Sequence, residues 1–515
     1  MTTEQREPLY ASTAKPWLKY YDQKYIDMPL PKCSAFEYLC HQNKNHLSET
    51  ALEYYGRKFT FADLFVNVKK TAAAFRALGV KKGDIITVVS VMTPEVIYAF
   101  YAVDMIGATL NLVDPRYSVE GIHEYIEEVD SRLLICLNVT YERCHKAEKR
   151  TNVERVLVIS PADSLPLHLA VGYKLTNPDK NRYKSNVLHR KDFIAQGKDQ
   201  SMNAEPSDPQ PLCMGLHVCI TPYLAPDMLG TLIRPHQPAH MFGVPAHYQQ
   251  MAASPLLKKK KDLSFIRNYA AGGDSLPLGA ELTVNEFLKA HNVEYPLAKG
   301  YGMTEVASAA TVAAGNVTKP GSVGIPMLNT VVSIFEPGTE TELPIGERGE
   351  ICICTPTVMK GYYNKPEETD MILRRHADGQ IWAHTGDVGY MDEDGFVYLD
   401  SRIKRMIIRH DGFKVFPSMI ENVISRHPAV HQCSVVGCTD KDHVQGRLPF
   451  VYVVLDPEGD KKKRQIVREL RQLCNEELPE YVQPVGNKFN SEMPYTPVGK
   501  VDYRKLEEEI TPRDY

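Results

Sequence analysis

The chain reads His384-Thr-Gly-Asp-Val-Gly-Tyr-Met-Asp-Glu-Asp-Gly-Phe-Val-Tyr-Leu-Asp-Ser-Arg-Ile-Lys404 over a stretch whose acidic, glycine and basic residues alternate in an order that a purely structural segment does not need. Asp387 follows a glycine after a short apolar stretch, and a carboxylate on a tight turn there can accept both hydroxyls of a ribose. Arg402 supplies forked donors nearby. The stretch therefore predicts one wall of a nucleotide site. Taken alone, it equally fits a surface hairpin, because Asp-Gly turns between strands are common.

Two further segments lie in a fixed order around this stretch: Tyr301-Gly-Met-Thr-Glu305 upstream and Thr496-Pro-Val-Gly-Lys500 near the end. Together the three motifs resemble the adenylate-forming superfamily, which includes acyl-CoA synthetases, adenylation domains of peptide synthetases and beetle luciferases. The resemblance runs from about Thr50 to about Lys505. It implies a two-step reaction, in which a carboxylate attacks ATP to give an acyl-adenylate and pyrophosphate, and a thiol, usually coenzyme A, then takes the acyl group.

Bulk properties agree with this resemblance and add little to it. The 515 residues suffice for two or three domains with a sizeable core. A net charge of -4 gives no reason to expect a nucleic-acid partner, and the run Lys258-Lys-Lys-Lys261 is short enough for a solvated loop or helix end. The polar amino terminus predicts no secretory signal and no integral membrane segment, and hence a cytoplasmic protein. Eleven scattered cysteines without a Cys-x-x-Cys pair argue against a zinc site or a disulfide framework, and favour small buried apolar residues.

Strand and helix patterns alternate in the first half of the chain. Asp84–Val91 is a β-branched strand, Pro94–Met105 a helix opened by proline, and Thr109–Val113 the next strand, which is the order of a parallel sheet. Further strands are expected at residues 132–136, 156–160, 216–220 and 240–244. From Val323 to Tyr362 the rhythm changes to strands broken by glycine turns, which predicts an antiparallel subdomain.

A separate pattern follows Lys404. A helix at Ser418–Arg426, strands at Gln432–Gly437 and Phe450–Leu455, and a helix at Lys461–Asn475 predict a compact α+β domain. The expected fold class is thus α/β, with a large N-terminal domain of mixed, largely parallel sheets plus an antiparallel subdomain (1–403) and a small α+β C-terminal domain (404–515). The resemblance places the catalytic cleft between two such domains.

The resemblance assigns the nucleotide contacts residue by residue. Gly272, Gly273 and Asp274 lie in a segment that the family uses against adenine, although a plain strand-to-helix turn would look the same. After an expected strand at 295–300, Tyr301 would stack on adenine and Gly302 would add flexibility.

Two catalytic residues follow directly. Thr304 would bind the α-phosphate, and Glu305 would hold Mg²⁺, an ion that takes few protein ligands besides phosphate oxygens. A loop with a capping threonine is the alternative.

Four positions in the C-terminal part complete the predicted machinery. Lys500 corresponds to the lysine that family members use for adenylation, where a mobile cation can meet charge developing on the carboxylate and α-phosphate, although Val498 replaces the usual serine or threonine. Lys404 corresponds to the hinge between the two half-reactions, with Ser401 in place of a glycine. Gly412 and Lys414 lie in a segment that resembles the lining of the pantetheine tunnel, or that forms an ordinary β-turn.

One family motif is missing. The serine-, threonine- and glycine-rich phosphate loop should lie between the strands at 156–160 and 216–220, but that interval carries the stretch Pro206-Ser-Asp-Pro-Gln-Pro211 and three glycines too far apart to wrap a phosphate. The segment that usually follows it and lines the acyl pocket is not found either, which indicates an internal deletion near 205–215. The explanations are a real deletion with changed function, a pseudo-enzyme that still binds a ligand, or a defective gene model.

The sequence predicts an ATP-dependent carboxylic acid:CoA ligase, most like a fatty acid ligase, that uses ATP, Mg²⁺ and coenzyme A. Val244-Pro-Ala-His-Tyr248 resembles a segment near the acyl pocket of fatty-acyl ligases. The alternatives are a catalytically impaired relative that binds nucleotide or acyl ligand without turnover, and a carrier-dependent adenylation enzyme. Losing one preorganised donor costs about 3 to 4 kcal/mol, so losing a loop of donors would slow adenylation by several orders of magnitude.

Overall fold

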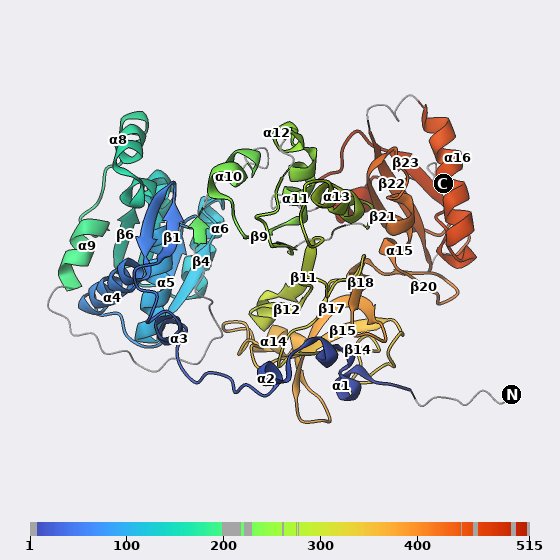
Figure 1. Cartoon of the computed structure of the whole chain (residues 1–515), viewed down its shortest axis with the longest axis horizontal. Helices are drawn as coiled ribbons and strands as arrows, with labels where there is room; N and C mark the ends of the chain where they lie inside the picture. The colour runs from blue at the N-terminus through green and yellow to red at the C-terminus, as the bar shows by residue number, and fades with distance from the viewer. Residues whose placement is uncertain are drawn as a thin grey trace. The chain divides into compact units, whose positions relative to one another are not determined.

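Several separate sheets, each covered by helices or loops, make up the computed structural model (Figure 1). It describes residues 8–197, 218–220, 229–259, 262–273, 276, 278–443, 445–456, 462–495 and 501–511. The contacts divide the chain into two compact units, Pro29–Leu224 on one hand and Met1–Met28 with Ala225–Tyr515 on the other. This division does not test the expected domain boundary at 403/404, which stays a prediction.

The unit Pro29–Leu224 is built on a five-stranded parallel sheet in the order β4-β3-β5-β6-β7, as the alternating pattern predicts. A three-stranded sheet in the order β2-β1-β8 lies in the same unit. Its strands are β1 (Thr50–Tyr54), β2 (Arg57–Thr60), β3 (Ile85–Val89), β4 (Thr109–Val113), β5 (Leu133–Leu137), β6 (Arg155–Ile159), β7 (Val187–His189) and β8 (Val218–Ile220). Its helices are α3 (Ala35–Gln42), α4 (Phe61–Ala77), α5 (Pro94–Ile106), α6 (Val119–Glu128), α7 (Tyr141–Ala147), α8 (Leu167–Thr176) and α9 (Arg190–Gln196).

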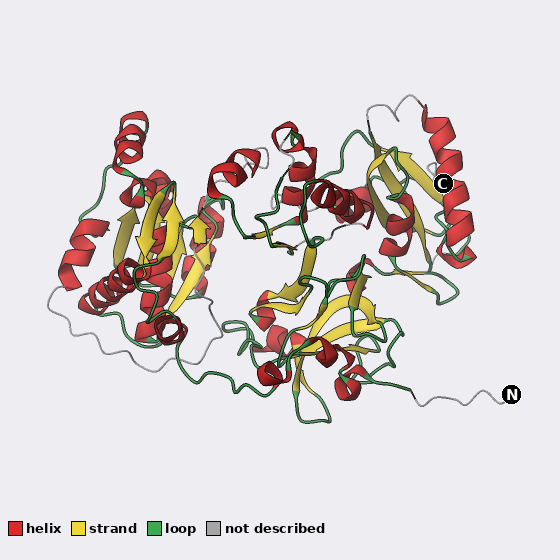
Figure 2. Ribbon diagram, in the orientation of Figure 1, coloured by secondary structure: helices red, strands yellow, loops and turns green. Residues whose placement is uncertain are grey.

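Strand β5 shows why this sheet needs helices on both faces (Figure 2). Leu133, Ile135 and Leu137 pack into the core that α4 and α5 cover. Leu134 and Cys136 point the opposite way, into the core that α6 and α7 cover. A strand that is apolar on both faces is stable only when both are shielded from water.

The second unit contains two five-stranded sheets. One runs in the order β13-β12-β11-β10-β9 and is parallel from β9 to β11, and the other is antiparallel in the order β14-β15-β17-β16 with β18 beside β17. The strands are β9 (His240–Gly243), β10 (Asn268–Ala271), β11 (Ala298–Met303), β12 (Ser308–Val312), β13 (Ile325–Pro326), β14 (Val331–Phe335), β15 (Gly349–Cys354), β16 (Leu373–Arg375), β17 (Ile381–Met391) and β18 (Val397–Arg402). The helices are α1 (Ala11–Ala14), α2 (Gln23–Ile26), α10 (Leu229–His236), α11 (Pro245–Ala253), α12 (Pro255–Lys258), α13 (Leu278–Ala290) and α14 (Pro366–Ile372). The antiparallel subdomain expected from Val323 onward is confirmed, and it extends through β18.

The C-terminal part has the predicted α+β order. Helix α15 packs against the antiparallel pair of β21 and β22, and β23 pairs with β22 in parallel. Its elements are β19 (Ile407–Ile408), β20 (Lys414–Val415), α15 (Pro417–Ile424), β21 (Val430–Thr439), β22 (Arg447–Leu455), α16 (Lys463–Glu477), β23 (Gly486–Phe489) and α17 (Tyr503–Glu508). The predicted fold class, a large α/β part followed by a small α+β part, is therefore confirmed.

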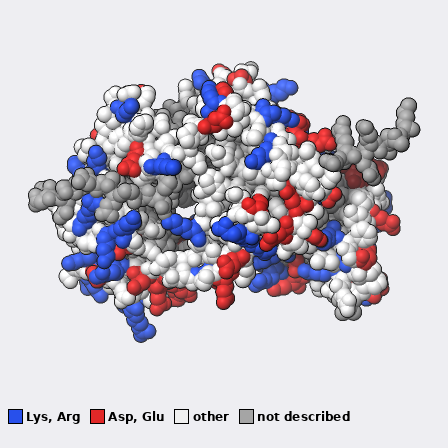
Figure 3. All heavy atoms as spheres, turned by 90° about the horizontal axis from the view of Figure 1, so that it is seen from below, with Lys and Arg blue, Asp and Glu red and all other residues white. Residues whose placement is uncertain are grey.

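The distribution of surface charges and the state of the cysteines are those of an ordinary globular protein. Figure 3 shows Lys and Arg side chains interspersed with Asp and Glu on the face that it draws. Within the described residues, the longest apolar helices fall short of what a membrane crossing requires. Among the described residues, nine cysteines carry free thiols, and five of these are buried. The absence of a nucleic-acid partner stays a prediction.

Candidate nucleotide site

Strand β11 itself carries Tyr301 and Gly302, so the expected strand at 295–300 was placed too early. The pairing of β11 with β12 shifts register between these two residues. At this shift the backbones come so close that a Cβ on Gly302 would lie 1.7 Å from the carbonyl oxygen of Ser308. The glycine that was predicted for flexibility is thus required by a close approach of two strands.

Tyr301, Asp387 and Arg402 meet, although 86 residues separate the first two in sequence. The Tyr301 hydroxyl donates to Oδ2 of Asp387 over 2.7 Å. Arg402 lies opposite Asp387 in the β17–β18 pair, and its Nε lies 3.0 Å from Oδ1. The Asp387 carboxylate is largely buried, whereas Arg402 is exposed. Oδ2 accepts one hydrogen bond and Oδ1 faces the Arg402 guanidinium as an ion pair, so each oxygen keeps a lone pair that can still accept a ribose hydroxyl.

Asp387 does not lie on a tight turn, as predicted, but at a bulge within the long strand β17. The register shift next to it is accompanied by a positive φ of 68° at Gly386. The Thr385 hydroxyl accepts a hydrogen bond from the Asp387 amide over 3.0 Å and donates one to the carbonyl of Ile351 over 2.7 Å. A bulge re-aims a side chain without ending the strand, which is how the sheet presents this carboxylate.

Three buried polar side chains, Glu350, His384 and His376, form a hydrogen-bonded series that supports the bulge. The sequence analysis did not predict this series. Glu350 accepts the Gly386 amide at 3.1 Å on one oxygen and faces His384 Nδ1 at 3.0 Å on the other. The Nε2 atoms of His384 and His376 lie 2.9 Å apart. Burial alone would raise the pKa of the Glu350 carboxyl, but His384 and the backbone amides outweigh it and hold this pKa below 4.5. The one available signal was a histidine directly before Thr-Gly-Asp.

Thr304 and Glu305 lie in the short 3₁₀ helix Thr304–Val306, between β11 and β12. Thr304 is exposed and Glu305 is half-buried. The Tyr362 hydroxyl donates to Oε1 of Glu305, and burial together with this bond raises the pKa of Tyr362 to about 12. Tyr362 was not predicted, because it comes from a loop 57 residues away.

Backbone strain follows directly after this helix. Ala307 has a φ of 61° and Ser308 a φ of 111°, both rare for residues with a side chain. Such strain persists only where the surrounding structure enforces it, and it is common at binding sites. Here the close pairing of Gly302 with β12 is the enforcing contact.

The glycine turn after β10 occupies the expected position. The Gly272 amide donates to the carbonyl of Gly243 over 3.1 Å, and Gly273 has a φ of 82°. Only Gly273 therefore needs the conformational freedom of glycine. Asp274 lies outside the described residues, and the contact of this turn with adenine stays a prediction.

A buried ion pair anchors the strand that carries Tyr301. The Lys299 ammonium bonds the Glu281 carboxylate of α13, and both side chains are almost fully buried. Glu281 also accepts the Gly321 amide over 3.0 Å. Burial lowers the pKa of Lys299, and the charge of Glu281 counteracts this. Sequence reasoning missed the pair, because Lys299 lies in a short strand without a charge pattern.

Within the described part of the chain, no hydrogen bond or ion pair joins the predicted residues of the C-terminal part to this cluster. Lys404 is exposed in the 3₁₀ helix Ile403–Arg405. Gly412 has a φ of 83° in the turn between β19 and β20, where its amide donates to the Arg409 carbonyl, so locally the ordinary β-turn is what forms. Lys414 is exposed on β20. Lys500 lies outside the described residues, and the hinge, coenzyme A and adenylation roles stay predictions.

Comparison with family models gives two matches. The AMP-binding enzyme model matches residues 39–209 and 209–363, and the AMP-binding enzyme C-terminal domain model matches residues 419–500. The first match is divided at residue 209, inside the segment where the deletion was predicted.

Similar proteins are found over nearly the whole chain. A long-chain-fatty-acid–CoA ligase of Bacillus subtilis is 27% identical over 571 residues, covering 96% of this chain and 98% of the relative. A 4-coumarate–CoA ligase of Petroselinum crispum is 24% identical over 555 residues, covering 96% and 97%. Among solved structures, the anthranilate CoA ligase AuaEII in complex with anthranoyl-AMP matches with a TM-score of 0.75 at 19% identity, covering 94% and 98%. ATP-bound MatB from Rhodopseudomonas palustris matches with a TM-score of 0.75 at 19% identity, covering 93% and 99%.

Proposed function

Since this chain belongs to the AMP-binding enzyme family, we propose that it is an acid–CoA ligase that activates a carboxylic acid as its acyl-adenylate and transfers the acyl group to coenzyme A. The observation that carries the proposal is the Asp387 carboxylate, fixed by Tyr301 on one oxygen and by Arg402 on the other. Thr304 and Glu305 follow Tyr301 on the same segment, so sugar and phosphate contacts would come from neighbouring positions of β11 and the helix after it.

The residues around Glu305 fit a magnesium ion carried by ATP. Tyr362 occupies Oε1, and among the described residues Oε2 has no recorded hydrogen bond. One carboxylate oxygen is enough, because Mg²⁺ takes its remaining ligands from phosphate oxygens and water. We assign Glu305 to hold the ion and Thr304 to bind the α-phosphate. The ion would supply charge neutralisation of the phosphates.

The acid itself is proposed from the relatives rather than from the site. A long-chain fatty acid agrees with the name of the Bacillus protein, and an aromatic acid with that of the Petroselinum protein. Tyr248, in the segment that resembles an acyl-pocket lining, is buried and donates to the carbonyl of Ala270 over 2.8 Å. Its hydroxyl therefore holds β10. We favour the fatty acid, because the Bacillus relative is 27% identical over 96% of this chain, whereas a probable 4-coumarate–CoA ligase of Dictyostelium discoideum is 28% identical over only 78% of it.

The large domain is proposed to be shortened near residues 205–215. The division of the family match at residue 209 supports this. The alignment with the Bacillus protein supports it as well. That alignment runs over 571 residues and is longer than this chain, so the relative has positions to which no residue of this chain corresponds. The C-terminal match from residue 419 supports a domain boundary near Lys404. A cytoplasmic location stays a prediction.

The test is carboxylate-dependent exchange of labelled pyrophosphate into ATP, with long-chain fatty acids and hydroxycinnamic acids compared in parallel. Lys500→Ala should abolish exchange, because the lysine neutralises charge that develops in the adenylation step. Lys505→Ala is the matched control, since Lys505 is an exposed lysine on α17 just beyond the same loop. Exchange that is unaffected by Lys500→Ala would contradict the assigned mechanism.

A second function is favoured by the missing phosphate loop. A protein that keeps Asp387, Tyr301 and Glu305 but lacks donors to the β- and γ-phosphates would bind nucleotide without turnover. Equilibrium binding of ATP and AMP distinguishes the two functions. Binding of both nucleotides with no pyrophosphate exchange for any acid would make this chain a non-catalytic binding protein. A carrier-dependent enzyme would show exchange but no transfer to coenzyme A.

A further inference from the structure

Two histidines and one aspartate that the proposed function does not use meet in the C-terminal part. His410 Nδ1 lies 3.1 Å from Oδ2 of Asp440, and His443 Nδ1 lies 3.3 Å from the same oxygen. The two imidazole rings are stacked, with centroids 3.5 Å apart and planes 6° from parallel. The three ligand atoms all lie within 4.8 Å of one another. Both histidines are exposed, whereas Asp440 is buried.

The fold holds this cluster in place from two segments. His410 belongs to the hairpin of β19 and β20, and the other two residues follow the end of β21. Oδ1 of Asp440 accepts the amides of Asp442 at 2.9 Å and His443 at 3.2 Å, which leaves Oδ2 directed at the two rings. At Gly446 a Cβ would lie 2.6 Å from the His410 amide nitrogen, so the two segments pack backbone to backbone. The carboxylate is therefore oriented before any ligand arrives.

Two of the three spacings in the cluster match those of ligands around one metal ion, and because an ion lies in the plane of each imidazole that binds it, one of the two parallel rings would rotate on binding. Nitrogen and oxygen ligands about 2.0–2.2 Å from Zn²⁺ stand roughly 3.0–3.5 Å apart at tetrahedral or square angles. The two distances to Asp440 Oδ2 fall in this range. Without an ion, both rings must donate a proton to one oxygen, and a divalent cation can replace both protons at once. We propose that His410, Asp440 and His443 form a binding site for a divalent transition-metal ion of the Zn²⁺ class.

Two imidazoles and one carboxylate select borderline metals such as Zn²⁺, Co²⁺ and Ni²⁺ over Mg²⁺ or Ca²⁺, which prefer oxygen ligands. Three protein ligands also leave a coordination position for water. The other cluster among the described residues that could hold an ion, Glu350 with Cys352 and His384, is fully buried. There, His384 already links Glu350 through Nδ1 to His376 through Nε2, beneath the Asp387 bulge.

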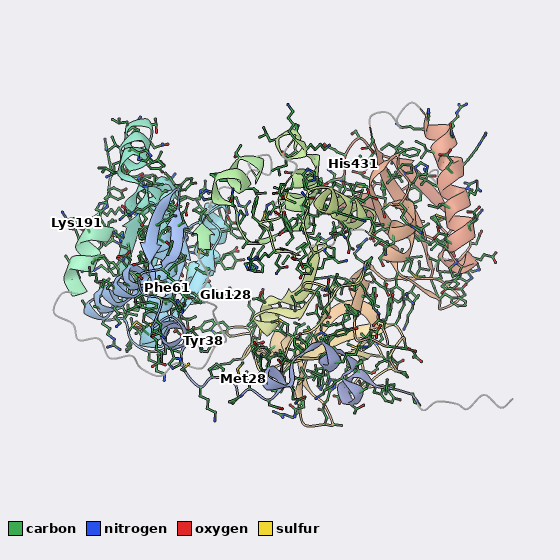
Figure 4. The ribbon with its side chains drawn as sticks, viewed as in Figure 1. Met28, Tyr38, Phe61, Glu128, Lys191 and His431 are labelled. Atoms are coloured by element: carbon green, nitrogen blue, oxygen red, sulfur yellow. The ribbon has the colours of Figure 1, made fainter. Side chains whose placement is uncertain are left out.

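The test is titration of the purified full chain with Zn²⁺ against a chromogenic chelator, followed by replacement with Co²⁺ for visible absorption. We expect one ion per chain. His410→Ala and His443→Ala should each weaken binding more than about 10-fold, because even outer-shell partners of a metal cost about 10–100-fold. His431→Ala is the matched control. His431 is exposed in the same part of the chain (Figure 4), and its Nδ1 lies 3.4 Å from Asp456, but among the described residues no second histidine contacts it.

The Co²⁺ spectrum separates the proposed ligands from the thiols. Ligand-field bands without thiolate charge-transfer absorption are expected for nitrogen and oxygen ligands, and they should be retained in His431→Ala. Zn²⁺ affinity unchanged in both His410→Ala and His443→Ala, or an absorption dominated by thiolate, would overturn the proposal. Because both substituted side chains are exposed, the variants should unfold like the wild-type protein. Neither readout depends on adenylation activity, so the proposal stands or fails independently of the proposed function.

Discussion

A single hydroxyl determines how Asp387 is presented. Burial raises the pKa of Tyr301 well above its usual value, and the Asp387 charge adds to the rise, so Tyr301 remains a hydrogen-bond donor at any physiological pH. Oδ2 of the carboxylate accepts this hydrogen bond, and Oδ1 forms an ion pair with the Arg402 guanidinium. Both donors come from strands, which makes the site more rigid than a loop would.

Removing that hydroxyl tests the arrangement. Tyr301→Phe should lower the free energy of unfolding by about 1–3 kcal/mol, because a largely buried carboxylate oxygen loses its donor. Urea unfolding measures the change. Tyr363→Phe is the control, since Tyr363 is exposed. Equal midpoints for the two variants would contradict the reading of Tyr301 as the anchor of Asp387.

Glu350→Gln tests the chain beneath the bulge. A carboxamide offers one oxygen, so either the Gly386 amide or His384 loses its acceptor, at a cost of about 1–3 kcal/mol. ATP should also bind more weakly, because the bulge positions Asp387. Stability and ATP affinity should both stay unchanged in Glu347→Gln, whose side chain is exposed.

The pH dependence of this effect has a definite sign. The pKa of Glu350 is lower in the folded chain than its ordinary value of 4.5, so its contribution is complete above pH 4.5 and is lost as the pH falls through the folded-state value. The difference in stability between wild type and Glu350→Gln should therefore shrink in acid. A difference that grows as the pH falls would show that the carboxylate is not the stabilised form.

At the scale of elements, the β11–β12 pair depends on Gly302. Gly302→Ala would place a Cβ 1.7 Å from a backbone oxygen that cannot rotate away, so the strands must separate. The cost should reach or exceed the upper end of about 1–3 kcal/mol for overpacking. Gly272→Ala, in the same unit, is the control, because its Cβ would meet only Gly300 oxygen at 3.4 Å. Thermal unfolding of both variants decides the matter, and similar midpoints would contradict the steric argument.

Elements also show where sequence patterns were sufficient. The parallel strands β3 to β6 and helix α5 lie within a few residues of their predicted positions, because long β-branched or proline-capped runs have a local cause. The start of β11 and the bulge in β17 were predicted wrongly. Both are set by pairing with another strand, through the β12 register at Gly302 and the β15 register at Glu350, and the periodicity of one strand carries no information about its partner's register.

For the whole molecule, buried tyrosines predict loss of stability in alkali. Burial raises the pKa values of Tyr54 and Tyr98 in one unit, and of Tyr248 and Tyr269 in the other, above the ordinary value of 10. The folded chain thus holds these protons when the unfolded chain has released them, so stability should fall as the pH rises above about 10. Urea unfolding monitored with tyrosinate absorbance measures this. Ionisation of these tyrosines near pH 10 without unfolding would contradict the prediction.

The sequence alone predicted the family, the fold class and most candidate residues from three short motifs that occur in a fixed order. This was possible because nucleotide chemistry requires particular side chains, and these can be recognised individually in a sequence. The sequence also predicts that the phosphate loop is missing, since a loop of that kind needs clustered glycines, and this stays a prediction. Folding alone revealed that Asp387 meets Tyr301 and Arg402, that Glu350 and Tyr362 support the site, and that His410 meets His443. These partners are 15 to 86 residues apart, and which of many possible partners meet is set by strand register and packing, which only the folded chain defines.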